Sequence, residues 1–163
     1  MSVLVVAALA LFACNDTANN KGAGAEEQVP AETKAPRSGS EALVTLHAGD
    51  DMKFDLTEIR VQEGQTVTLI LRHTGKLTKQ AMGHNFVLLA KNVSASDFAS
   101  AALHAAETDY VPPQSKEVIA HTKLLAGGES DTITFFAPEK GVYEFLCSFP
   151  GHVSLMKGKF IVE

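Results

Sequence analysis

The stretch CSFPGHVSLM, residues 147–156, holds three side chains that can act as metal ligands. Cys147 offers a strongly donating thiolate, His152 an imidazole and Met156 a weak thioether. Pro150-Gly151 predicts a sharp turn between the thiol and the imidazole. Taken singly, a cysteine or a methionine is more often a core residue than a ligand. Together, the C-x₄-H-x₃-M spacing predicts a metal-binding loop.

A second histidine would complete a His₂Cys set with a long axial sulfur, the donor set of blue copper. MGHN at residues 82–85 supplies the candidate, His84, whose alternative role is that of a hydrogen-bonded core histidine. The segment VYEFLC (142–147) is predicted to be a strand that ends at Cys147. His84 must come from another strand, and ligands on rigid strands rearrange little when the metal changes charge.

The elements that would position these ligands are short and β-rich. The predicted strands are TVTLILR (66–72), HNFVLLA (84–90), DTITFFA (131–137), VYEFLC (142–147) and GKFIVE (158–163). Glycine-containing turns separate them, which favours an all-β sandwich or barrel. SASDFASAALHAAE (94–107) predicts a single helix capped by Ser94 and Asp97, with Phe98, Ala102 and Leu103 on one face.

The chain begins with an uncharged apolar run, MSVLVVAALALFA, too short to span a bilayer. Residues 1–13 are predicted to be a lipoprotein signal peptide. The segment ends LFAC, which resembles a bacterial lipobox and predicts lipidation of Cys14; a buried thiol is the alternative. Residues 15–40 contain no Ile, Leu, Met or aromatic residue, so residues 14–40 are predicted to be a lipidated cysteine and a disordered tether.

Residues 41–163 are then the folded domain, and Cys147 has no second cysteine there. An unpaired cysteine outside the cytoplasm favours metal ligation. The net charge of −5 argues against nucleic acid as a partner.

GHN (83–85) and CSFPGHVSLMKG (147–158) resemble the azurin branch of the cupredoxins. HTGKLTKQAMGHNFVLL (73–89) and VIAHTKLLAGGESDTITF (118–135) agree, and the likeness covers about residues 41–163. The resemblance implies a cupredoxin-like Greek-key β-sandwich or barrel with one short inserted helix. The leader and tether resemble those of lipid-modified azurins, which implies the outer membrane of a Gram-negative bacterium.

The resemblance also implies one copper ion with three strong ligands and two weak ones on opposite sides. The strong ligands are His84, Cys147 and His152. The weak ones are the Met156 sulfur and the Gly83 carbonyl. The Asn85 backbone N–H is expected to bond the Cys147 sulfur, and the Asn85 side chain to bond the Ser148 segment. Such outer contacts orient ligands and tune redox potential; simple turn stabilisation is their alternative role.

A docking patch is implied around the exposed edge of His152, through which electrons would leave. Its members are Met52, Leu77, Met82, Phe149, Pro150, Val153 and Leu155, with core packing as the alternative for each. The implied partners are redox proteins such as c-type cytochromes, a haem peroxidase or nitrite reductase. His73 matches a histidine near the copper of azurins, and an interior hydrogen-bonded histidine is its alternative. His104 and His121 are expected at the surface.

Three functions remain open: a one-electron carrier, a copper storage or delivery module with the same ligands, and an interaction or structural domain. No triad, paired-carboxylate site or phosphate loop is visible, which argues against an enzyme and a small-molecule substrate. Two features depart from the family. The places of its usual disulfide hold Ala42 and a residue near Gln65, and Phe86 stands where a tryptophan is common.

Overall fold

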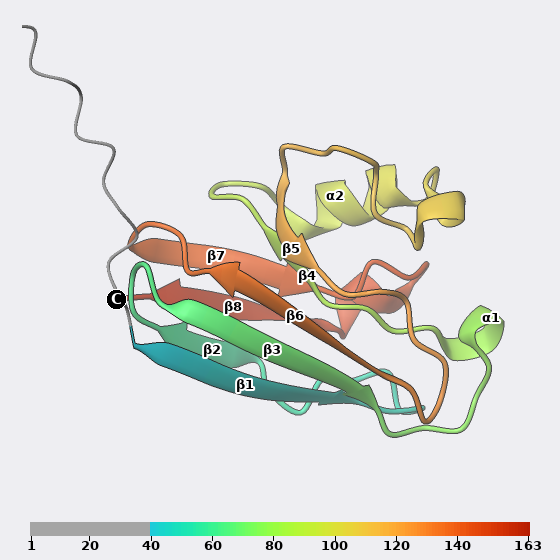
Figure 1. The fold of residues 1–163 in the computed structure, drawn as a ribbon. Helices are drawn as coiled ribbons and strands as arrows, with labels where there is room; N and C mark the ends of the chain where they lie inside the picture. Colours follow the sequence, from blue (N-terminus) through green and yellow to red (C-terminus); the bar gives the residue numbers. More distant parts are fainter. Residues whose placement is uncertain (1–39) are drawn as a thin grey trace, which may run out of the picture. The chain divides into compact units, whose positions relative to one another are not determined.

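The computed structural model describes residues 40–163, which form a sandwich of two β-sheets (Figure 1). One sheet has the order β1-β3-β6 and the other the order β2-β8-β7-β4-β5. The strands are β1 (Glu41–Ala48), β2 (Glu58–Val61), β3 (Thr66–His73), β4 (Val87–Leu89), β5 (Val118–His121), β6 (Ser130–Phe136), β7 (Gly141–Leu146) and β8 (Lys157–Val162). The predicted all-β sandwich is confirmed.

The strand pairing explains how distant residues meet. β1 pairs with β3 and β2 with β8 in parallel, whereas β6 pairs with β3 and β7 with both β8 and β4 antiparallel. Parallel neighbours cannot be joined by a tight hairpin. The chain therefore passes from one sheet to the other after β1 and again after β2.

The core fills the space between the sheets because each strand alternates apolar and polar residues. In β3, Val67, Leu69, Leu71 and His73 point inward, while the intervening residues face out. Phe145 of β7 contacts both Phe54 and Phe86, with ring centroids 5.7 and 5.4 Å apart. Phe86, which stands where the resemblance implies a tryptophan, is completely buried and belongs to this core.

Helix α2 (Ala95–Ala102) covers the outer face of the five-stranded sheet (Figure 1). This cover explains why β4 is apolar on both faces: Leu88 belongs to the main core, whereas Val87 and Leu89 pack with Phe98 of the helix. The Ser94 hydroxyl accepts the Asp97 N–H (3.4 Å), so the predicted N-terminal cap forms.

The prediction of one helix over 94–107 is wrong in its second half. The N–H groups of His104 and Ala105 bond the carbonyls of Ala101 and Ala102, a tighter spacing that ends the α-helix. A separate 3₁₀ turn, η1 (Ala106–Thr108), follows. Leu103, predicted on the buried face, is 51% exposed. Two further short elements were not predicted: helix α1 (Lys79–Met82) and the 3₁₀ turn η2 (His152–Ser154).

Where the resemblance to azurins implies a disulfide, Ala42 pairs in register with Val67. The side chain of Gln65, which lies nearby, makes hydrogen bonds to two other parts of the chain in place of a covalent bridge. Its side-chain amide donates to the Ser40 hydroxyl (2.7 Å), and its carbonyl oxygen accepts the Gln62 N–H (2.7 Å). Hydrogen bonds thus join the start of β1 to the β2–β3 turn.

The predicted signal peptide, Cys14 and most of the predicted tether lie outside the described residues. Between Ser40 and Glu163, the structure contains no helix with the length and apolar character needed to cross a membrane. In Figure 1, α1 and the loop that follows β7 lie at the end of the sandwich opposite the start of β1 and the C-terminus.

We expect Gly158→Ala to destabilise the sandwich, because Gly158 lies where β8 crosses beneath an aromatic ring. A Cβ there would lie 2.3 Å from the Phe145 ring and 2.5 Å from the Thr57 carbonyl oxygen. Overpacking of this kind costs about 1–3 kcal/mol, measurable by urea unfolding. The matched control is Lys157→Ala at the neighbouring exposed position, expected within about 0.5 kcal/mol of the parent. Equal stability of both variants would contradict this packing.

Candidate metal centre

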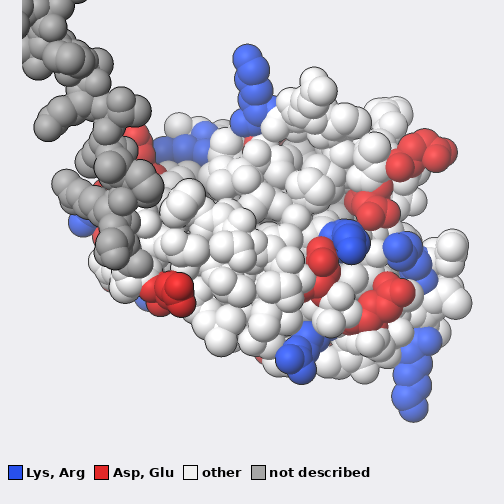
Figure 2. All heavy atoms as spheres, in the orientation of Figure 1, with Lys and Arg blue, Asp and Glu red and all other residues white. Residues whose placement is uncertain are grey.

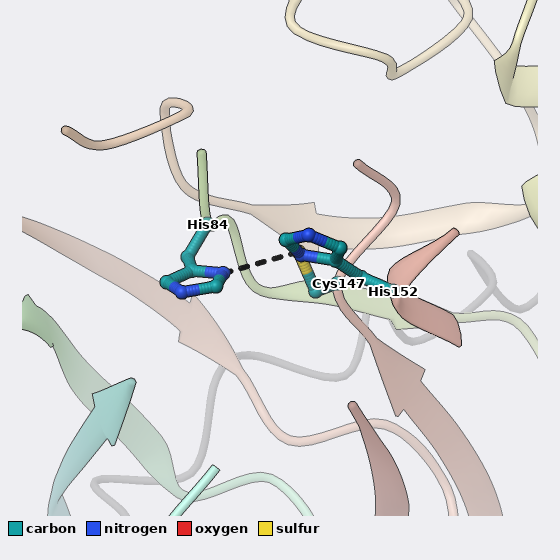
Figure 3. Close-up of side chains that lie close together, drawn as sticks. All are labelled: His84, Cys147 and His152. Atoms are coloured by element: carbon teal, nitrogen blue, oxygen red, sulfur yellow. Dashed lines mark hydrogen bonds between the residues drawn. The ribbon is translucent and has the colours of Figure 1, made fainter. Parts of the chain in front are cut away.

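Three buried side chains, from the segment after α1 and the segment after β7, lie close together (Figure 3). They are His84, Cys147 and His152, and their ligand atoms all lie within 4.8 Å of one another. The Cys147 sulfur lies 3.9 Å from Nδ1 of His84 and 3.5 Å from Nδ1 of His152. Two imidazoles and a thiol from two separate segments therefore form one cluster.

His84 is fixed by contacts on both its backbone and its ring. Its N–H and carbonyl exchange hydrogen bonds with Leu125 (3.1 and 2.8 Å), which forms an isolated bridge. Its ring Nε2 donates to the carbonyl of Gly49 (2.8 Å), in the turn after β1. The proton must therefore be on Nε2, which leaves the Nδ1 lone pair directed toward Cys147.

The segment from Cys147 to Met156 is closed at its base. The Cys147 N–H donates to the Met156 carbonyl (2.9 Å), and the Met156 N–H donates to the His152 carbonyl (2.8 Å). Gly151 has φ +82, a left-handed conformation that glycine adopts without steric cost, so the turn returns the chain toward the thiol. Met156 is completely buried, and the Gly83 carbonyl oxygen lies 3.8 Å from the Cys147 sulfur.

The Asn85 carboxamide links the two ligand-bearing segments. Its oxygen accepts the Ser148 N–H (2.8 Å), and its NH₂ donates to the Ser148 hydroxyl (2.8 Å). The same NH₂ donates to the carbonyl of Asp109 (3.0 Å). Asn85 and Ser148 are almost fully buried, so these bonds are shielded from water.

His73 lies beside the cluster, with its ring centroid 4.4 Å from that of His84. Nε2 donates to the Met82 carbonyl (2.8 Å), and Nδ1 accepts the Gly75 N–H (3.1 Å). Both ring nitrogens are thus satisfied within the protein. His104 and His121 lie at the surface, as expected.

Burial keeps the metal-free cluster uncharged. It raises the pKa of the Cys147 thiol to about 11, although the Asn85 and Phe149 backbone N–H groups act in the opposite direction. It also lowers the pKa of His152 to about 4, with a smaller contribution from the neighbouring His84. Burial lowers the pKa of His84 as well. Both imidazoles therefore keep a free lone pair at neutral pH, and the thiol must lose its proton when a metal binds.

The donor set fits copper. A thiolate and two imidazoles, enclosed away from water, are the ligands of copper electron-transfer sites. The bond from the His84 ring to the Gly49 carbonyl also fixes the orientation of that imidazole. The site is therefore compatible with one copper ion.

The predicted docking-patch residues differ in exposure. Leu77 and Leu155 are 44% and 54% exposed, whereas the other five are partly buried. The Phe149 ring lies 4.7 Å from the His152 ring, and Met52 and Phe149 also contact the main core. Val153 packs against the cluster under α2. For these three, core packing and surface exposure occur together.

Several residues that fix the ligands were missed by sequence reasoning. The Gly49, Leu125 and Asp109 contacts involve backbone atoms, which every residue type supplies. Only the positive φ of Asp109 (56°) favours a particular residue class. No sequence pattern marks these contacts, because the fold alone brings the carbonyls to the site.

Comparison with known proteins gives a match over the whole described region. The model of a family described as copper binding proteins, plastocyanin/azurin family, matches residues 40–163. Azurin of Pseudomonas chlororaphis is 39% identical over 129 residues, which are 76% of this chain and all of the relative. Outer membrane protein H.8 of Neisseria gonorrhoeae is 42% identical over 119 residues, 71% of this chain but only 64% of that relative.

The fold has known counterparts too. Auracyanin A of Chloroflexus aurantiacus, described as a blue copper protein, superposes with a TM-score of 0.69. It is 32% identical, and the match covers 76% of this chain and all of that one. The similarity confirms the predicted cupredoxin-like sandwich.

We expect the metal-free protein to lose stability as the pH falls from about 6.5 toward about 4. The pKa of His152 is about 4 in the folded protein against an ordinary 6.5, so the unfolded chain binds the proton preferentially. The contribution of neutral His152 to the free energy of unfolding is complete above the unfolded pKa, and it declines as the pH falls through this window. Urea unfolding at several pH values measures it. His152→Gln should flatten the profile, whereas Leu43→Gln at an exposed position of β1 should not. Identical profiles for the parent and His152→Gln would contradict the assignment.

Proposed function

Because this chain belongs to the plastocyanin/azurin family of copper-binding proteins, we propose that it is a type 1 (blue) copper protein that carries single electrons between redox proteins. The observation that carries the proposal is the convergence of one thiol and two neutral imidazoles in a buried cluster. A bound copper ion would supply the Cu(I)/Cu(II) couple there. In this proposal His84, Cys147 and His152 are its strong ligands.

The weaker ligands of the proposal are the Met156 sulfur and the Gly83 carbonyl. The complete burial of Met156 and the 3.8 Å between the Gly83 oxygen and the Cys147 sulfur support their presence at the site. A thioether and a carbonyl are weak donors, so they adjust the potential more than they hold the ion.

Rigid support of the ligands favours electron transfer. The Gly49 carbonyl fixes the His84 ring, and the bonds of Asn85 to Ser148 fix the chain next to Cys147. None of these contacts requires a metal. Ligands held in this way move little when the charge at the site changes, which lowers the cost of oxidation and reduction.

The same burial argues against the alternative of copper storage or delivery. A delivery protein must expose its ligands to an acceptor, whereas the three ligand residues here are at most 3% exposed. The sequence shows no catalytic triad, paired-carboxylate site or phosphate loop, so we propose no enzymatic activity. Reduction of a haem protein and copper transfer to a chelator, both timed by stopped flow, separate the two functions.

We further propose that redox partners, such as c-type cytochromes, a haem peroxidase or nitrite reductase, bind at the docking patch. Leu77 and Leu155 supply exposed apolar area, and Phe149 contacts the His152 ring directly. A close apolar contact beside one ligand would shorten the electron's path. Figure 2 shows charged side chains of both signs at the end of the molecule that carries α1.

The proposed location is the bacterial cell envelope, with Cys14 as the lipid anchor and residues 1–13 as its signal. The lipobox-like LFAC and the relationship to the Neisseria outer membrane protein support it. The loop after β7, which carries Cys147 and His152, lies at the end opposite the start of β1 (Figure 1), so we propose that an anchor before Ser40 leaves the docking patch free.

We expect Cys147→Ser to abolish the intense visible colour of the copper-loaded protein, because the colour requires a thiolate ligand. Absorption and paramagnetic-resonance spectra of the loaded protein measure the loss. Cys14→Ser is the matched control and should keep the parent spectrum. A blue Cys147→Ser protein would refute the assignment of the site.

We expect Met82→Lys to slow electron exchange with a c-type cytochrome roughly tenfold, equivalent to about 1.4 kcal/mol, because a charge would be desolvated in the contact. The protein should still hold copper, because the Met82 side chain is not a proposed ligand. Leu43→Lys, at a position 71% exposed on β1, is the control and should react at the parent rate. Equal rates for both variants would remove the docking patch.

A further inference from the structure

Two consecutive residues near the metal centre have a left-handed backbone. Asp109 and Tyr110 have φ values of 56° and 60°. This region is uncommon for any residue other than glycine, and more so for a bulky tyrosine than for an aspartate. Such a conformation persists only where surrounding contacts impose it, and it is enriched at functional sites. Local hydrogen bonds help to hold it here, and three further contacts of these two residues lead toward the metal cluster.

Asp109 contacts the supports of two ligands. Its carbonyl accepts the Asn85 NH₂ (3.0 Å), and the Asn85 oxygen in turn holds the Ser148 N–H next to Cys147. Its carboxylate accepts the Leu124 N–H (3.2 Å). The next residue, Leu125, forms the backbone bridge to His84.

Tyr110 contacts the support of the third ligand. Its ring packs edge-on against Phe149, with centroids 5.4 Å apart and planes at 75°. Phe149 lies 4.7 Å from the His152 ring. The Tyr110 N–H donates to the Ala105 carbonyl (2.9 Å), which joins this corner to the segment after α2.

We propose that the Asp109–Tyr110 corner is a positioning element that holds the segments bearing all three ligands in place before a metal binds. Asp109 acts through Asn85 and Leu124, and Tyr110 acts through Phe149. Neither residue is a ligand. The inference rests on the proposed function only in taking His84, Cys147 and His152 as ligands, so it can be tested without copper.

The test is amide hydrogen exchange of the metal-free protein. Asp109→Ala loses the carboxylate and disfavours positive φ, so the Ser148 amide should exchange about tenfold faster relative to amides of β3, which report global opening. Asp109→Asn keeps an acceptor and tolerates the conformation, and should stay within about twofold of the parent. The matched control is Gln114→Ala, because Gln114 has the same φ (56°) in the same excursion.

An unchanged Ser148 rate in Asp109→Ala, or an equal acceleration in Gln114→Ala, would overturn the proposal. Should Asp109→Ala fail to fold, Asp109→Gly tests the carboxylate alone, because glycine adopts this φ without strain; the Ser148 amide should again exchange faster than in the parent. Asn85→Ala is the positive reference that must accelerate exchange at Ser148.

A second measurement addresses Tyr110 in the copper-loaded protein. Tyr110→Ala should release copper to a chelator about fivefold faster, whereas Tyr110→Phe, which keeps the ring against Phe149, should release it at the parent rate. Equal rates in both variants would refute the role of Tyr110. A parent protein that forms no coloured copper complex would refute the proposed function, and the exchange result at Ser148 would still decide the proposal for Asp109.

Discussion

The structure depends on keeping one thiol and two imidazoles together where water cannot reach them. Burial raises the pKa of Cys147 to about 11 and lowers that of His152 to about 4. The metal-free cluster therefore carries no charge, and it can be enclosed without the large penalty of buried ions. Polar contacts from the rest of the protein fix the site, with the Gly49 carbonyl bonded to the His84 ring and Asn85 bonded to Ser148 next to Cys147.

The two-sheet sandwich makes this enclosure possible. β7 ends immediately before Cys147, and β8 begins immediately after Met156, so the loop starts and ends on paired strands. His84 lies just before β4, the strand that pairs with the opposite edge of β7 from β8. The segment between β4 and β5, which contains α2, covers the outer face of the sheet and brings Asp109 to Asn85. Local loops hold the ligands, and long-range pairing decides where those loops meet.

Much of this could be predicted, and the misses have physical reasons. The loop from Cys147 to Met156 could be predicted as a metal-binding segment because its candidate ligands are distinctive side chains at close spacing. The strand predicted over 84–90 begins only at Val87, because residues 84–86 bond instead to Thr122 and Leu125. The helix predicted to 107 ends at Ala102, where tighter hydrogen bonds replace the α-helical spacing. The groups at Gly49 and Asp109 that hold the site are backbone carbonyls. Every residue type has a backbone carbonyl, so the sequence gives no sign of these contacts.

The bond from the Cys147 N–H to the Met156 carbonyl extends the β7–β8 ladder by one step beyond the pair Leu146–Lys157. The residues between Cys147 and Met156 thus form the loop of a hairpin whose register is set by the pairing of β7 with β8. Residues could be added to or removed from that loop without shifting either strand. Hairpin length is therefore a variable that natural variation or protein engineering can change separately from the scaffold, and with it the spacing of His152 from the thiol.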